Sequence, residues 1–123
     1  MPVTLPSLVS LKKRIQRECD IKIHRMGAIC FLRNGHVLAT ACNRKGNGYV
    51  SEFSFHTEEM VLERSAYARK RTKAKAYILV VRFLSSGEFG LAKPCEGCYQ
   101  LCKDEGIAGI YYTTVDGIQK QKT

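Results

Sequence analysis

Two short motifs in the sequence combine residue types that can bind a metal ion and move a proton. The first is His-x-Glu, at His56 and Glu58, and the second is Pro-Cys-x-x-Cys, with its cysteines at Cys95 and Cys98. One imidazole and two thiolates can hold a zinc ion and leave the fourth tetrahedral position open, as in a catalytic rather than a structural site. Water in that position has a pKa near neutral and supplies hydroxide without a strong base. We therefore predict that His56, Cys95 and Cys98 are zinc ligands.

Glu58 follows His56 by two residues, at the predicted start of a helix. In the middle of a helix such side chains point about 200° apart, but at the first turn both can converge on a site beyond the helix end. A carboxylate there can take a proton from water and pass it to a substrate nitrogen. We therefore predict that Glu58 is the catalytic proton shuttle and not a ligand.

The cysteine pair is also predicted to begin a helix, where backbone N–H groups and the helix dipole favour thiolates. Taken alone, Cys95-x-x-Cys98 also fits a redox pair or half of a structural zinc site, and His-x-Glu occurs often by chance. Their order along the chain, on two helices that flank a buried strand, makes the combination more specific.

Hydrophobic patterning predicts a layered α/β domain in which helices and strands alternate. Ser7 is a candidate cap for a first helix to about Glu18, and Asn34-Gly35 is a hairpin signal. The predicted elements after the first helix are strands over 24–32 and 36–42, a loop over 43–54, a helix over 56–70, a strand over 76–83, a loop over 85–90, a helix over 95–105, a strand over 109–113 and a short last strand.

The 123 residues suffice for one domain with a real core, so we predict a single domain over residues 1–123. Its expected fold class is α/β, a three-layer α/β/α sandwich with a mixed sheet of about five strands and helices on both faces. The nearly continuous apolar run at 76–83 is typical of a buried central strand. Because no apolar run approaches the roughly 20 residues of a membrane span and no signal peptide is evident, we expect a cytoplasmic protein.

Together, the two motifs resemble the signature of the cytidine/deoxycytidylate deaminase superfamily, which is His-x-Glu followed by Pro-Cys-x-x-Cys. The resemblance covers about residues 26–114 and includes the order of strands and helices. It implies zinc-dependent hydrolytic deamination of the cytosine base of a nucleoside or nucleotide (cytidine, deoxycytidine or dCMP) to uracil. The positions that match are His56, Cys95 and Cys98 for the zinc ligands and Glu58 for the catalytic carboxylate.

The sequence departs from the branches of this superfamily in small ways. Thr57 replaces the more common Ala, a change small enough to leave the mechanism intact. Gln100 resembles the Gln of small nucleoside deaminases, but Tyr99 stands where that branch has Arg. Residues 106–107 and 110–112 look more like the deoxycytidylate branch, whose further strand and helix the chain lacks.

The predicted loop before the second helix carries the candidate substrate-binding residues. The resemblance matches Asn43 to an Asn that contacts the ribose, although Asn also suits a turn that opens a glycine-containing loop. Arg44 and Lys45 beside it could meet a 5′-phosphate. Phe55 could stack on a flat base, with core packing as the alternative.

The formal net charge of +9 is unusual, and basic residues cluster at 12–17 and 64–75. Such a surface attracts the phosphates of a nucleotide or a nucleic acid, or it is simply a solvated helix face. An editing deaminase acting on single-stranded DNA or RNA is therefore an alternative function. A non-catalytic zinc-binding module is another, although a structural site has no need of Glu58.

The sequence contains six cysteines, and without a secretion signal we expect reduced thiols or metal ligands instead of disulfides. Cys19, Cys30, Cys42 and Cys102 are expected to be small buried hydrophobes. Cys102, one turn after Cys98, could also approach the metal. Superfamily members commonly form oligomers, so the resemblance implies a homo-oligomer.

Overall fold

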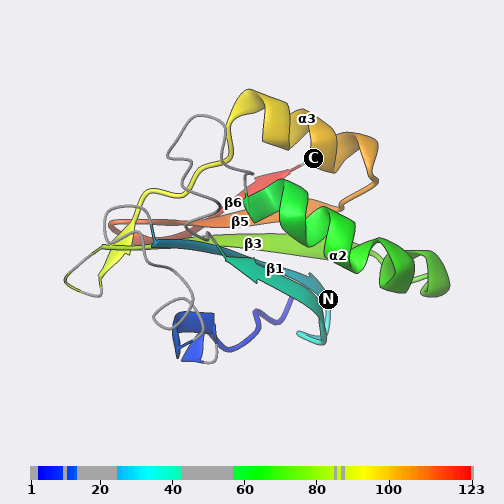
Figure 1. The fold of residues 1–123 in the computed structure, drawn as a ribbon, viewed down its shortest axis with the longest axis horizontal. Coiled ribbons are helices and arrows are strands. Elements are labelled where there is room, and N and C mark those ends of the chain that lie inside the picture. The colour runs from blue at the N-terminus through cyan, green and yellow to red at the C-terminus, as the bar shows by residue number, and fades with distance from the viewer. Residues whose placement is uncertain are drawn as a thin grey trace, which may run out of the picture.

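The structure, a computed structural model, describes residues 3–9, 11–13, 25–42, 57–84, 86 and 88–122. Its centre is a six-stranded mixed sheet in the order β2-β1-β3-β5-β6, with β4 paired to β3 outside this path (Figure 1). The elements are β1 (Arg25–Leu32), β2 (Val37–Cys42), α2 (Thr57–Arg71), β3 (Ala76–Phe83), β4 (Phe89–Gly90), α3 (Glu96–Asp104), β5 (Gly109–Thr114) and β6 (Gly117–Lys122). The pairing of β3 with β5 is parallel, and the other pairings are antiparallel.

β3 is the central strand, and all its residues are buried except the half-buried Arg82. Successive side chains of a strand point to opposite faces of the sheet. Ile78 and Val80 therefore join the hydrophobic core on one face, and Tyr77 and Leu79 join the core on the other. Burial on both faces explains the continuous apolar run and confirms the predicted central strand.

Helical segments cover both faces of the sheet, which confirms the predicted α/β/α sandwich. On one face, α2 contributes Val61 and Leu62 to the core, and α3 contributes Cys102. On the opposite face, Leu8 and Leu11 of the N-terminal segment pack against the second core. Figure 1 shows α2 and α3 above the sheet and the blue N-terminal turn below it.

The N-terminal helix begins where the sequence predicts. The N–H of Val9 donates to Oγ of Ser7 over 3.3 Å, and the N–H of Lys12 donates to the carbonyl of Leu8 over 2.9 Å. Val9 and residues 11–13 are helical, and the predicted continuation over 14–18 lies outside the described residues. No helix of the described part of the chain is long and apolar enough to cross a membrane.

The predicted hairpin between β1 and β2 is also present. Gly35 has a φ of +90°, a backbone conformation that favours glycine, and its N–H donates to the carbonyl of Leu32 over 2.8 Å. Oδ1 of Asn34 accepts a hydrogen bond from the N–H of His36 over 3.0 Å. The Asn-Gly pair therefore shapes the turn through a side-chain contact and a left-handed glycine.

One predicted loop contains a strand instead. Residues 85–90 were expected to form a loop, but Phe89 and Gly90 form β4 and pair with Phe83 and Arg82 at the end of β3. The N–H of Leu84 donates to the carbonyl of Glu88 over 2.8 Å and closes the turn. The rings of Phe83 and Phe89 lie 5.7 Å apart, so an aromatic contact across the turn stabilises a pairing too short for a pattern to reveal.

Gly106 ends α3, as predicted, in a left-handed conformation with a φ of +78°. Its N–H donates to the carbonyl of Lys103 over 3.1 Å, and the N–H of Ile107 donates to the carbonyl of Cys102 over 3.0 Å. These two bonds are those of a Schellman motif, and the buried Ile107 supplies its hydrophobic contact.

We predict that Gly106→Ala lowers the free energy of unfolding by about 1 kcal/mol, because a Cβ disfavours the left-handed conformation. Gly97 is the matched control: it lies inside α3, where a Cβ would meet nothing within 4 Å. Gly97→Ala should stabilise the protein by up to about 1 kcal/mol through helix propensity. Urea unfolding of both variants measures the difference, and equal effects would contradict the role given to Gly106.

Candidate functional site

The sheet topology brings the starts of α2 and α3 to the same edge. Each helix precedes one of the parallel strands, β3 or β5, and each runs back along the same face of the sheet. Both helices therefore begin where β3 and β5 end, on the left in Figure 1. In sheets of this kind, ligands bind outside the carboxyl ends of the parallel strands. We call this side of the molecule the catalytic edge.

The connection that leads into α3 is fastened to the end of β5. Thr113 is buried, and its hydroxyl donates to the carbonyl of Gly90 over 2.8 Å while accepting a hydrogen bond from the N–H of Arg82 over 3.0 Å. The carbonyl of Thr113 accepts a hydrogen bond from the N–H of Ala92 over 2.9 Å. Thr113 thus fixes the chain a few residues before the cysteine motif.

Cys95 and Cys98 occupy the first turn of α3. Cys95 is the N-cap residue, in extended conformation, and its thiol does not cap the helix. Its carbonyl accepts the first helical hydrogen bond, from the N–H of Tyr99 over 2.9 Å. Cys98 is only 2% exposed, and its side chain is hydrogen-bonded to those of Cys95 and Glu58. The structure therefore brings both predicted cysteines together with the predicted proton shuttle.

Glu58 lies in the first turn of α2 and is buried, with 3% of its surface exposed. The hydroxyl of Thr57, itself 1% exposed, donates to Oε1 of Glu58 over 2.9 Å. The sequence identified Thr57 only as a tolerated replacement, and the hydrogen bond to Glu58 was missed. No sequence signal could have identified it, because the burial that makes the hydroxyl need a partner is known only from the structure.

The electrostatics of this cluster suit a cation. Burial first, and then the Glu58 carboxylate, raise the pKa of the Cys98 thiol above its usual range. The same two causes raise the pKa of Cys102 to about 12. A bound metal ion reverses this balance, because a coordinating thiol is deprotonated outright. Cys95 and Cys98 thus offer two donors of a kind that zinc takes, which is part of a ligand set and not a whole one.

The remaining predicted site residues lie outside the described residues: His56, Asn43, Arg44, Lys45 and Phe55. Within the described part of the chain, no group of three or more His, Cys, Asp or Glu side chains could hold a metal ion. All three zinc ligands therefore remain predictions made from the motifs. β2 ends at the catalytic edge, since Cys42 pairs with Gly27 near the start of β1.

The free cysteines of the described residues include Cys30, Cys42 and Cys102, and all of these are buried. This confirms the expectation of small buried hydrophobes for these positions, whereas Cys19 is outside the described residues. Cys102 and Glu58 interact electrostatically, so Cys102 belongs to the surroundings of the cluster.

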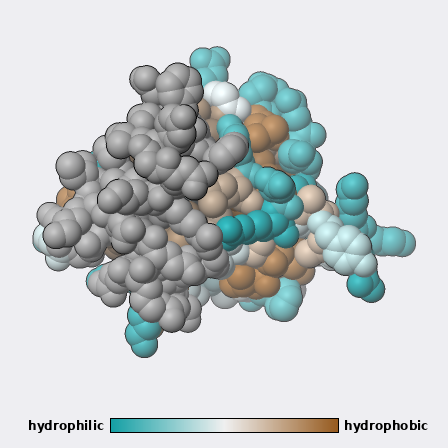
Figure 2. All heavy atoms as spheres, in the orientation of Figure 1, coloured by the Kyte–Doolittle hydropathy of each residue, from teal (hydrophilic) through white to brown (hydrophobic). Residues whose placement is uncertain are grey.

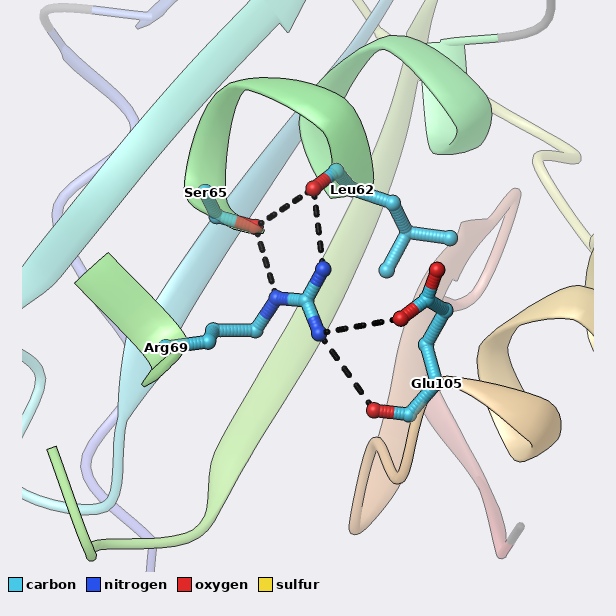
Figure 3. Close-up of polar contacts among 4 residues, drawn as sticks. All are labelled: Leu62, Ser65, Arg69 and Glu105. Carbon is cyan, nitrogen blue, oxygen red and sulfur yellow. Dashed lines mark hydrogen bonds and ion pairs between the residues drawn. The ribbon is translucent and has the colours of Figure 1, made fainter. Parts of the chain in front are cut away.

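At the other end of the helices, Arg69 ties α2 to the end of α3 (Figure 3). Its guanidinium donates to Oγ of Ser65 over 3.0 Å and to the carbonyl of Leu62 over 2.9 Å, both within α2. It also donates to the carbonyl of Glu105 over 3.3 Å and lies 3.6 Å from the Glu105 carboxylate. The sequence identifies Arg69 only as a member of the basic cluster at 64–75. In the structure, its contacts hold together α2 and α3, the two helices that carry Glu58, Cys95 and Cys98.

The comparisons with known proteins agree with this arrangement. The family model described as "Cytidine and deoxycytidylate deaminase zinc-binding region" matches residues 6–114. No curated protein matches the chain significantly. Among solved structures, the cytidine deaminase from Mycobacterium leprae aligns with a TM-score of 0.53 and 18% identity, over 89% of this chain and 87% of that chain. At this identity, the match shows a shared fold.

We predict that the purified protein retains about one zinc ion per chain and that Cys98→Ala abolishes this binding, because a three-residue ligand set does not survive the loss of a thiolate. Cys30→Ala is the matched control, since Cys30 is an equally buried thiol on β1. Metal analysis after dialysis measures the zinc content. Full zinc content in Cys98→Ala would contradict the assigned ligand.

Proposed function

Because this chain belongs to the cytidine and deoxycytidylate deaminase family, we propose that it is a zinc-dependent enzyme that hydrolyses the amino group from the cytosine base of a nucleoside or nucleotide. The observation that carries this proposal is the cluster of Cys95, Cys98 and Glu58 at the catalytic edge. A redox cysteine pair works through a thiolate, which burial and the Glu58 carboxylate disfavour at Cys98 by raising its pKa. A structural zinc site has no need of a buried carboxylate beside its thiols.

The three ligands proposed for zinc are His56, Cys95 and Cys98. When bound, zinc would lower the pKa of a water molecule and so supply hydroxide near neutral pH. Cys95 and Cys98 hold their positions through the first turn of α3, whose dipole favours negative charge at that end. His56 directly precedes α2 in the sequence, two residues before Glu58.

Glu58 moves the proton in this mechanism. Its carboxylate takes a proton from water and delivers it to the ring nitrogen of the base as the tetrahedral centre forms at C4, and it then assists the departure of ammonia. Because Glu58 is buried, its carboxylate is shielded from bulk water, and its charge acts strongly on nearby groups. The hydrogen bond from Thr57 occupies Oε1 and so orients the carboxylate.

For the substrate, we favour cytidine, deoxycytidine or dCMP over a polynucleotide. The resemblance to small nucleoside deaminases supports this choice. Asn43 is proposed to contact the ribose, Arg44 and Lys45 a 5′-phosphate, and Phe55 the base. These residues follow β2, which ends at the catalytic edge. We also propose that the protein is cytoplasmic and assembles as a homo-oligomer, as the resemblance implies.

We predict that the zinc-loaded protein releases ammonia from at least one substrate in a panel of cytidine, deoxycytidine and their 5′-phosphates, detected by mass spectrometry. Glu58→Gln should retain zinc and the hydrogen bond from Thr57 but lose roughly 10²- to 10⁴-fold in kcat, because the amide cannot carry the proton. Undiminished turnover by this variant would rule out Glu58 as the shuttle.

We predict that Thr57→Ala lowers kcat roughly tenfold with little change in KM, because a hydrogen bond to a charged group contributes about 1.5–3 kcal/mol. Thr57→Ser keeps the hydroxyl and should retain most of the activity. Zinc content should be the same in both variants. Equal kcat values for Thr57→Ala and Thr57→Ser would show that the hydroxyl does not act on Glu58.

A further inference from the structure

A second group of chemically active side chains lies at the end of the molecule opposite the catalytic edge. We call it the basic surface and define it by Tyr67, Lys70, Arg71, Lys73 and Lys75, all of them exposed. It covers the last turn of α2 and the connection to β3. Figure 2 shows that this end of the molecule, on the right, is covered by hydrophilic residues.

The basic surface borders a concave region. The side chains that line a pocket of about 420 Å³ there include Arg69, Lys70, Lys73, Lys75 and Glu105. Within this lining, Arg69 and Glu105 form an ion pair with each other. Lys70, Lys73 and Lys75 make no ion pair with any described residue, so their charges are available to an anion.

Stabilisation of α2 accounts for only part of this charge. Arg69, Lys70 and Arg71 lie in the last turn of α2, where cations complement the helix dipole. Lys73 and Lys75 lie beyond the helix and gain little from its dipole. The hydroxyl of Thr72 accepts a hydrogen bond from the N–H of Ala74 over 3.1 Å. This bond gives the connection a defined shape and holds the lysines beside the pocket.

Tyr67 adds a flat surface to these charges. It is 71% exposed, and it lies three residues before Lys70, so the two side chains are neighbours on the helix surface. The Arg71 guanidinium lies 5.6 Å from the centre of the Tyr67 ring and donates to the phenolic oxygen over 3.5 Å. An exposed, oriented ring beside several lysines is the combination that binds stacked bases and their phosphates.

We propose that the basic surface binds a single-stranded nucleic acid, with lysines 70, 73 and 75 on its phosphates and Tyr67 stacked on a base. Glu58 precedes Lys70 by about 18 Å along α2, at about 1.5 Å per residue. This binding site is therefore separate from the catalytic edge, and it does not depend on the proposed deamination.

A single-stranded nucleic acid explains the basic surface better than a lipid membrane does. A membrane-binding surface needs apolar side chains that insert beside its basic residues. The exposed large hydrophobics of the described residues are Leu5, Val9, Val37, Tyr67, Leu91 and Val115. Of these, Tyr67 is the member that lies on the basic surface. A concave pocket between lysines also fits a phosphate group better than it fits the flat surface of a bilayer.

The test is fluorescence anisotropy of the full chain with a labelled single-stranded 12-mer of thymidylate. Thymine has no exocyclic amine, so the oligonucleotide cannot be a substrate, and the result is independent of deamination. We expect Lys70→Gln/Lys73→Gln/Lys75→Gln to weaken binding at least tenfold at low salt. The slope of log K against log salt should fall by about 2, since each phosphate contact contributes about 0.7.

The matched control neutralises three exposed lysines elsewhere, as Lys13→Gln/Lys93→Gln/Lys120→Gln. It carries the same change in net charge and should lose much less affinity. Equal losses in the two triple variants would show a diffuse charge effect and overturn the proposal. A greater loss of affinity in the control, which includes Lys93 beside the cysteine motif, would place the bound oligonucleotide elsewhere. That result would overturn the proposal as well.

Tyr67 gives a second measurement that does not depend on charge. Tyr67→Ala should weaken binding roughly tenfold with an unchanged salt slope, because a stacking contact releases no counterions. Tyr67→Phe keeps the ring and should bind as the parent protein does. No binding by the parent protein, or tighter binding to anionic lipid vesicles than to the oligonucleotide, would also overturn the proposal.

Discussion

The parallel pairing of β3 with β5 is the constraint on which the rest of the structure depends. Two parallel neighbours must be joined by a crossover, and α3 forms that crossover on the face that α2 already covers. Both helices then run the same way and begin at the same edge. Residues far apart in the sequence, Glu58 and Cys98, come into hydrogen-bonding contact for this reason. An antiparallel pairing would have put the two motifs at opposite ends of the sheet.

The cluster at this edge is unfavourable for a protein without a cation. Burial first, and then the Glu58 carboxylate, raise the pKa of the Cys98 and Cys102 thiols. A core built for stability alone would avoid such a grouping, since uncompensated buried charge is costly. The family match offers a reason for it, because the family model that covers residues 6–114 describes a zinc-binding region, and the zinc site proposed above lies at this end of the sheet. Thr113 fixes the connection that leads into α3, and Arg69 holds the opposite ends of α2 and α3 together.

The two ends of α2 have contrasting chemistry. Its first turn carries Glu58 and Glu59, and its last turn carries Arg69, Lys70 and Arg71. This order complements the helix dipole, so it stabilises the helix whatever else it does. It also separates the proposed catalytic site from the proposed binding surface. In these two proposals, one helix connects catalysis at one edge with binding of a polyanion at the other.

The sequence by itself determined the elements and the motif, because both rest on local patterns. The apolar run of β3, the Asn34-Gly35 turn and the stop at Gly106 each act through nearby backbone, and the structure confirms them. The tertiary structure alone decided the pairing of β4, the hydrogen bond from Thr57 to Glu58 and the contacts of Arg69. The β4 pairing is a local hairpin of two residues per strand, too short to leave a pattern. The contacts of Arg69 with Glu105 join residues that other segments bring together, and the Thr57 contact depends on side-chain orientation and burial. Sequence spacing specifies none of these.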